Sequence, residues 1–437
     1  MNRMDHLPQS PSTEHLSIGL QTALTFPLME ALLGRRSRRF PLGGSLPDGP
    51  LAYTSPEEAR PLSELEQLLL LTAMTGNTGW HYLLPRQRLE LPHIANYPAA
   101  AGGRTFPSAA GWHTTELFYT DDNGAYFFAT RDTPALVEPD QDGRVDVVAW
   151  LNAHRPLIRK LGDGRLYLPP TAMDGHNTWV ANAPGSTLLI PVADLAQHLI
   201  AVLCYMVQNG GCIYNNLHDE RIPGLEQFRH LVDVDNPAPL SEIEQNCLTM
   251  CMAELSTACY AGQLLLQAMG LGGWMFTGLD AYALLGCSGD PAVPGLGFRY
   301  DRNPRWTTPN PTGLPGVFTG FCPPHYPNLR AAVDAFVERK FGPGGPLHAE
   351  TAGPWRETAH VRANAPIHSE EAKACVAHMA QYIYDRFGRF PATVPSIFAR
   401  IFLQAQHLDL GFYDHHFTPG AYLHTHANHM ANWHPNG

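Results

Sequence analysis

Four arginines surround Ser37 in the segment RRSRRF, residues 35–40, of a chain that is otherwise acidic. Guanidinium groups and a hydroxyl suit a phosphate dianion, because bidentate charge-assisted hydrogen bonds match its oxygens. A solvated basic surface would have the same composition. The formal net charge of −11 argues against a general nucleic-acid binder, which needs a broad positive surface. We therefore expect a local seat for one small anion and no nucleic-acid partner.

Two further segments are rich in small and polar residues that would let a planar ligand approach the backbone. One is TGNTGWHY, residues 75–82, which is followed by RTFPSAAGWHTTELFY, residues 104–119. The other is AMGLGGWMFTGLD, residues 268–280, with glycines on both sides of an aromatic group. Glycine permits close backbone approach, and amides and hydroxyls can bond the polar edge of a ring. Alone, the first is equally typical of a turn, and the last of a helix C-cap followed by a core strand.

Histidines are concentrated near the end of the chain, where seven of the 22 fall between residues 407 and 434. Neutral imidazoles with a nearby carboxylate are suited to zinc, iron or copper. We expect a transition metal, zinc or iron, with Asp409 or Asp414 as the carboxylate or as a group that orients a ligand. The alternative is a polar, aromatic tail that covers an active site or a partner subunit. The candidate ligands are His407, His415, His424, His426 and His429.

The elements that must position these residues are indicated by local signals. A helix is expected over residues 24–34, ending at Gly34, and the next begins with Ser63 and Glu66 in capping-box register. Two aromatic strands flank residues 121–124, Asp-Asp-Asn-Gly, which is typical of a hairpin. We expect further helices over residues 369–387 and then up to about His407.

The longest predicted helix covers residues 241–269 and should be buried on most sides. Ser241 and Glu244 suggest a second capping box, and Gly270 a C-cap. Its apolar length is typical of a packing or dimerisation element. The eight cysteines include no C-x-x-C pair, which favours buried thiols in a reducing compartment. The chain shows no signal-peptide pattern and no uninterrupted membrane span, so we expect a cytoplasmic protein without a membrane partner.

Read together, the order and spacing of the three ligand segments resemble the FMN-dependent nitroreductase-like superfamily. The resemblance covers roughly residues 28–302, with insertions near residues 85–103, 132–185 and 208–240. The segment that contains Pro107 and Ser108 resembles the azoline dehydrogenase branch of this superfamily. The chain also departs from the pattern, because Thr277 stands where many nitroreductases have Glu. The resemblance implies flavin contacts at Arg35, Arg36, Ser37, Arg39, Asn77, Pro107, Ser108, Met275, Phe276, Thr277 and Gly278.

The resemblance also implies a fold and an activity. The fold would be α+β, with a central antiparallel or mixed sheet flanked by helices and a long buried dimerisation helix. The activity would be reduction or dehydrogenation of a small organic substrate by hydride transfer through FMN, in a homodimer, with NAD(P)H as a candidate electron donor. His81, His113 and Glu116 are candidates for proton transfer, or are polar residues packed at the edge of the core.

The division of the chain follows from the same resemblance. It gives an N-terminal extension (1–27), an FMN-binding domain with insertions (28–320) and a helical, His-rich extension (321–437). Two other functions remain open at this point. The histidines could make the protein a metal-dependent enzyme in which the flavin-like fold is only a scaffold. The chain could also sequester flavin or metal without catalysis, because a fold does not determine a function.

Overall fold

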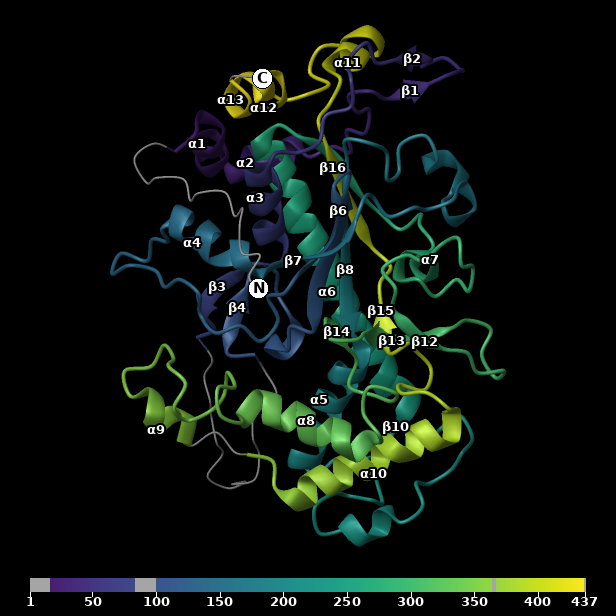
Figure 1. Cartoon of the computed structure of the whole chain (residues 1–437). Helices are drawn as coiled ribbons and strands as arrows, with labels where there is room; N and C mark the ends of the chain where they lie inside the picture. Colours follow the sequence, from purple (N-terminus) through teal and green to yellow (C-terminus); the bar gives the residue numbers. More distant parts are fainter. Residues whose placement is uncertain (1–15, 83–99, 364–366, 436–437) are drawn as a thin grey trace, which may run out of the picture.

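The computed structural model describes residues 16–82, 100–363 and 367–435, and it has an α+β architecture. Its largest sheet has the strand order β11-β16-β8-β5-β6-β7, with β15 also paired to β8, and every pairing is antiparallel (Figure 1). The strands are β5 (Thr115–Asp121), β6 (Gly124–Phe128), β7 (Ile158–Asp163), β8 (Thr187–Asp194), β11 (Gly272–Phe276), β15 (Ile397–Phe398) and β16 (Phe402–Gln406).

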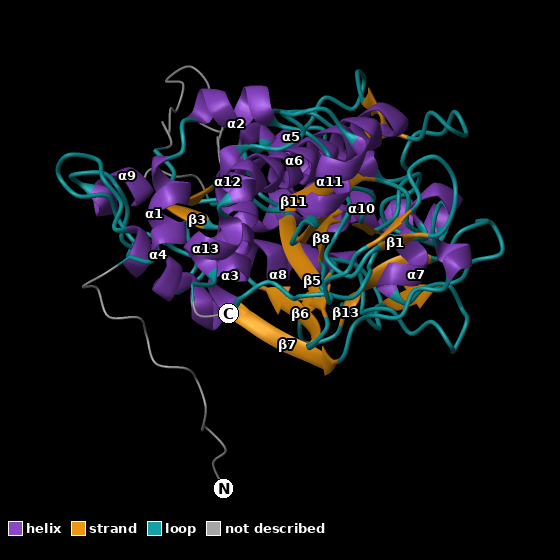
Figure 2. Ribbon diagram, turned by 90° about the horizontal axis from the view of Figure 1, so that it is seen from above, coloured by secondary structure: helices purple, strands orange, loops and turns teal. Residues whose placement is uncertain are grey.

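Helices and loops cover both faces of this sheet (Figure 2). Side chains alternate along β5, so Leu117 packs with α3 (Glu64–Thr75) and α6 (Leu240–Met269), whereas Phe118 packs with α7 (Ala281–Leu285) on the other face. A larger cluster joins α5 (Leu195–Gln208), α8 (Leu329–Phe341) and α10 (Glu370–Phe387).

Short elements complete the described chain. The helices among them are α1 (Ile18–Thr25), α2 (Leu28–Gly34), α4 (Val147–His154), α9 (Thr358–Ala363), α11 (Leu410–His416), α12 (His424–Ala427) and α13 (His429–Trp433). The strands are β1 (Ser45–Leu46), β2 (Tyr53–Thr54), β3 (Asn77–Trp80), β4 (Gly102–Arg104), β9 (Ile213–Tyr214), β10 (Ala238–Pro239), β12 (Arg299–Asp301), β13 (Asn310–Leu314) and β14 (Phe318–Thr319).

Several local predictions are confirmed. The capping box of α3 forms, since Ser63 and Glu66 exchange side-chain and backbone hydrogen bonds. The hairpin forms at Asp121, whose carboxylate accepts the Asn123 and Gly124 N–H groups. Gly270 caps α6 with a φ of 78°, which glycine adopts without strain. All eight cysteines are buried free thiols.

Three predictions about helices are wrong. The expected helix over residues 24–34 is two helices, because Pro27 starts α2 and breaks the chain from α1. Ser241 does not cap α6, which begins one residue earlier, and the Glu244 carboxylate instead accepts the Ala392 and Thr393 N–H groups. α6 is buried along one face rather than on most sides, leaving residues such as Tyr260 exposed.

The segment before His407 is the most consequential difference. The sequence predicts a helix there, but β16 enters the main sheet between β11 and β8. Gln404 and Gln406 are two residues apart, which is the spacing of one face of a strand, and both are buried and bonded: Gln404 donates to the Val180 carbonyl and Gln406 to that of Arg39.

Two predicted regions fall partly outside the described residues, namely positions 1–15 of the N-terminal extension and most of the insertion at 85–103. Among the residues that the structure does describe, no helix combines the length and the apolar character that a membrane crossing requires.

Candidate metal centre and the predicted flavin segments

One carboxylate and three imidazoles converge where the end of the chain meets helix α3. Glu66 lies in the first turn of α3, His407 follows the last residue of β16, His429 begins α13 and His434 follows that helix. One ligand atom of each lies within 4.8 Å of those of the others. Glu66, His407 and His429 are buried, whereas His434 is partly accessible, with 10% of its side chain exposed. We call these four residues the Glu66 cluster.

The capping box of α3 fixes the orientation of the Glu66 carboxylate. Its Oε2 accepts the Ser63 N–H at 2.6 Å, which leaves Oε1 to face the three histidines. The Nε2 atoms of His407, His429 and His434 lie 3.5, 3.0 and 3.2 Å from Oε1. A helix N-terminus also favours a negative charge at this position.

Backbone carbonyls determine the tautomers of two of these histidines. His407 Nδ1 lies 3.0 Å from the Arg60 carbonyl oxygen, and His429 Nδ1 lies 2.8 Å from that of Met269. A carbonyl only accepts, so each Nδ1 carries the proton, and in a neutral ring Nε2 is then a bare lone pair. The His407 lone pair is directed at Glu66 Oε1, whereas His429 Nε2 lies 3.0 Å from the same oxygen without hydrogen-bond geometry and has no other partner among the described residues. Histidines that ligate metals are commonly held in this way, through their other ring nitrogen.

The Glu66 cluster can accommodate a cation. Burial acts to raise the pKa of Glu66, whereas hydrogen bonds donated by the three imidazoles outweigh burial and lower that pKa below its usual range. In the tautomers that the carbonyls favour, His407 and His429 present no Nε2–H, so their donation requires an extra proton on these rings. A divalent cation in the same place uses every lone pair and leaves a net charge of only +1.

Only two of the predicted metal ligands, His407 and His429, belong to the Glu66 cluster. His415 is exposed on α11, and exposed His424 contacts the Phe26 ring. His426 is buried, and its Nδ1 accepts the Leu423 N–H.

The predicted carboxylates are also elsewhere. Asp409 caps α11 by accepting the Phe412 N–H, and Asp414 accepts the Tyr422 hydroxyl. Sequence reasoning therefore missed Glu66 and His434 as members of the cluster. The capping-box pattern correctly predicts the hydrogen bond that Glu66 Oε2 accepts from Ser63, but it gives no indication of what Oε1 contacts.

The first and third flavin segments lie side by side. The Gly273 N–H of β11 donates to the Arg38 carbonyl at 2.8 Å, and the Arg39 guanidinium lies over the Trp274 ring. Arg36, Ser37, Met275 and Thr277 are exposed, Arg35, Arg39 and Phe276 are half-buried, and Gly278 is buried.

Arg38 is not among the flavin contacts that the resemblance implies, and it is only 4% exposed. Its guanidinium donates to the Ala421 and Gly34 carbonyls and to the side chain of Gln267. The C-terminal end of α6 and the chain end together bury this side chain.

The second flavin segment lies elsewhere. The amide of Asn77 is buried and donates to Thr133 and Pro134. Pro107 is exposed, and Ser108 donates to Glu254 on α6 at 2.5 Å. The contact of α6 with β11 is made by Gln263, nine residues further along, or about 13 Å at the rise of an α-helix.

Two of the three candidates for proton transfer are neighbours. The His81 and His113 rings lie 5.8 Å apart. Burial lowers the pKa of both imidazoles, and the charge of Arg104 lowers that of His113 further, so both are neutral near pH 7. Glu116 instead accepts the Thr130 and Arg131 N–H groups and fixes the turn after β6.

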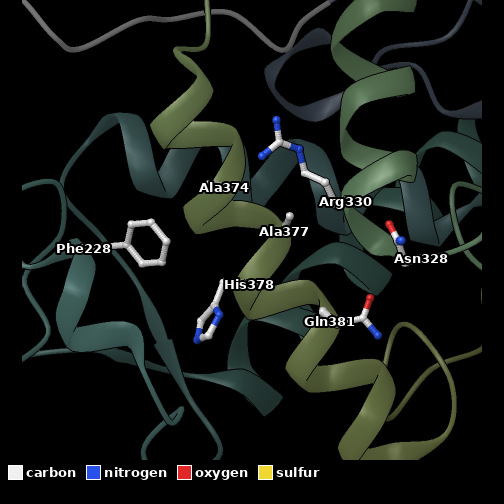
Figure 3. Close-up of a pocket in the computed structure, with 7 residues that line it drawn as sticks. All are labelled: Phe228, Asn328, Arg330, Ala374, Ala377, His378 and Gln381. Atoms are coloured by element: carbon white, nitrogen blue, oxygen red, sulfur yellow. The ribbon is translucent and has the colours of Figure 1, made fainter.

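A surface hollow of about 400 Å³ lies beside α10, away from all the predicted site residues (Figure 3). Its one cationic side chain, Arg330, is ion-paired with Asp334 and Glu370. The lining residues are Phe228, Asn328, Arg330, Ala374, Ala377, His378 and Gln381.

Comparison with known proteins gives distant structural similarity alone. No family model and no curated protein matches the chain. A solved structure described as a "putative nitroreductase" from Ralstonia eutropha JMP134 is 16% identical, over 63% of this chain and 76% of that one. The TM-score is 0.29, a level at which the similarity assigns neither a family nor an activity.

Proposed function

We propose that this protein binds one transition-metal ion through Glu66, His407, His429 and His434. One observation carries the proposal: the bare Nε2 atoms of His407 and His429 lie 3.5 and 3.0 Å from one carboxylate oxygen in a buried space. Acceptor atoms this close together need a cation or a proton among them, and one divalent ion serves all of them at once.

The chemistry of the donors selects the ion. Three imidazole nitrogens and one carboxylate oxygen suit zinc or ferrous iron, whereas magnesium and calcium prefer oxygen ligands throughout. Four protein ligands are a full set for zinc, which is typical of a structural site. His434 is the most exposed of the four, so its position is the one most readily given up to water or a substrate.

Metal stoichiometry tests this proposal. The full-length chain is stripped with a chelator and dialysed against zinc, and bound metal is measured by mass spectrometry. We expect one zinc ion per chain in the wild type and in His424→Ala, an exposed histidine outside the Glu66 cluster. His407→Ala and Glu66→Gln should lose the ion. Stoichiometric zinc in both of these variants would rule out the assigned ligands.

A second candidate function is that of an FMN-dependent oxidoreductase acting on a small organic substrate. It is favoured by the pairing of the Arg38 backbone with Gly273, which joins two of the segments that resemble flavin-binding motifs. When bound, FMN would supply hydride transfer. Arg35, Arg36 and Arg39 have no carboxylate partner among the described residues, so their charge is available to a phosphate.

The fit to FMN is partial, because Arg36, Arg39 and Asn77 already donate hydrogen bonds within the fold. The visible spectrum of the purified protein, before and after adding FMN, tests this candidate. A yellow protein, or one that binds added FMN, would support it. A colourless protein that does not bind FMN would exclude it.

We also propose that the protein forms a homodimer. Helix α2 exposes large apolar side chains to solvent, with Leu28, Met29 and Leu33 exposed by 60–71%. Apolar surface of this kind is usually covered by a partner, and a second copy of the chain would cover it. Sedimentation should show a dimer that Leu33→Glu dissociates. A monomeric wild type would contradict the proposal.

A further inference from the structure

The last segment of the chain lies across the C-terminal end of α6. We call residues 417–435 the C-terminal tail; it contains α12 and α13, which lie beside α1 (Figure 1). Trp433 packs against Gly19 of α1, and Leu423 lies against Gly34 at the end of α2. The tail therefore covers the place where the first helices of the chain meet α6.

No apolar side chain of the tail is fully buried. Its buried residues are Thr425, His426 and His429, which are all polar. Ala421, Tyr422 and Trp433 are half-buried and pack against the core clusters, whereas Met430 is exposed. The hydrophobic effect is proportional to the apolar area removed from water, so these half-buried side chains supply only part of the docking.

Direct hydrogen bonds attach the tail at three points. The Thr425 hydroxyl donates to the Gln267 carbonyl at 2.7 Å, and His429 Nδ1 donates to that of Met269 at 2.8 Å. The Ala421 carbonyl accepts from Arg38 Nε at 2.8 Å. Such bonds replace bonds to water, so their net contribution to docking is modest.

The Glu66 cluster joins the tail to the rest of the molecule. His429 and His434 belong to the tail, whereas Glu66 and His407 are fixed in α3 and behind β16. Without a cation, the bare Nε2 of His429 lies 3.0 Å from Glu66 Oε1 with no hydrogen bond between them, so this contact contributes no attraction to docking. With a cation, the same four groups all attract the ion.

We infer that the metal ion acts as a clasp: the tail is docked when the Glu66 cluster is occupied and is released when it is empty. This inference rests on the metal binding proposed above. Release would remove the Ala421 carbonyl from Arg38 and the Thr425 hydroxyl from the end of α6. Metal supply would thereby control access to Arg38 and to the basic segment around it.

Hydrogen exchange measured by mass spectrometry on the full-length chain tests the clasp. Peptides from residues 417–435 should exchange about tenfold or more slowly with one equivalent of zinc than with chelator, because docking protects their backbone N–H groups. Peptides from β5 and β8, which lie inside the sheet, serve as an internal reference and should not change.

Two variants and a metal assay make the outcome decisive. His434→Ala removes a partly exposed ligand and should abolish the zinc effect. His424→Ala alters an exposed tail histidine outside the Glu66 cluster and should retain it. Stoichiometric zinc with unchanged tail exchange would overturn the clasp while leaving the metal site intact. Absence of zinc binding would overturn both.

Discussion

Replacing Glu66 by glutamine separates a metal ligand from a simple ion-pair partner. The new side chain would keep the shape of the old one, and its carbonyl could still accept the Ser63 N–H of the capping box. Its amide NH2 would then face the His407 and His429 Nε2 atoms, which are lone pairs in the tautomers that the carbonyls impose. In metal-free protein, the substitution therefore exchanges a repulsion for hydrogen bonds. We expect Glu66→Gln to be neutral or to stabilise by up to about 1.5 kcal/mol.

With zinc present, the sign of the effect reverses. At a zinc concentration of about 100 times the wild-type Kd, binding stabilises the native state by about 2.7 kcal/mol. If loss of the carboxylate weakens binding about a hundredfold, the variant retains only about 0.4 kcal/mol of that stabilisation, so zinc binding favours the wild type by about 2.3 kcal/mol. Because the variant gains up to about 1.5 kcal/mol without metal, the net difference in zinc is about 0.8–2.3 kcal/mol.

Urea unfolding of the wild type and Glu66→Gln, first in chelator and then in zinc, measures the sign of the stability difference under each condition. The reasoning would be refuted if Glu66→Gln destabilised the metal-free protein by about 3–5 kcal/mol, the cost of breaking a buried ion pair. That result would show that Glu66 neutralises imidazolium groups instead of binding a metal.

Three further predictions concern other parts of the molecule. Arg35→Ala should weaken FMN binding by about 1.5–3 kcal/mol in a flavin titration, the contribution of a hydrogen bond to a charged group, and an unchanged affinity would remove the phosphate role. Lys340→Met should lower the free energy of unfolding in urea by about 3–5 kcal/mol, because it leaves the buried Asp132 carboxylate without one of its partners; a loss under about 1 kcal/mol would contradict this. Burial lowers the pKa of His198 to about 3, so between about pH 6.5 and pH 3 the imidazole is protonated in the unfolded chain but neutral in the native chain. The free energy of unfolding should therefore fall by up to about 1.4 kcal/mol per pH unit as the pH drops through this range. His198→Phe should reduce that slope in unfolding curves measured between about pH 7 and pH 4, and an identical slope would show that His198 does not contribute.

Features that depend on a few adjacent residues could be read from the sequence. The capping box at Ser63 and Glu66, the hairpin after Asp121 and the C-cap at Gly270 each follow from local hydrogen-bonding geometry. Pro27 is also a local signal, because a proline inside a predicted helix indicates a break, and here it separates α1 from α2.

The Glu66 cluster could not be predicted in this way, because its members are distant in sequence. Glu66 and His407 are 341 residues apart, and they meet only because β16 enters the sheet between β11 and β8. A short buried strand is not readily distinguished from a helical segment by periodicity. The high density of histidines indicated a metal site, but the fold decides which of them converge.

X-ray absorption at the zinc edge tests the proposed metal centre most directly. The zinc-loaded full-length protein should show four nitrogen or oxygen neighbours at about 2.0–2.1 Å, with scattering from three imidazole rings. The eight buried cysteines are the competing soft ligands in this chain. Sulfur neighbours at about 2.3 Å, or a shell of oxygens without imidazole scattering, would contradict a site made of Glu66, His407, His429 and His434.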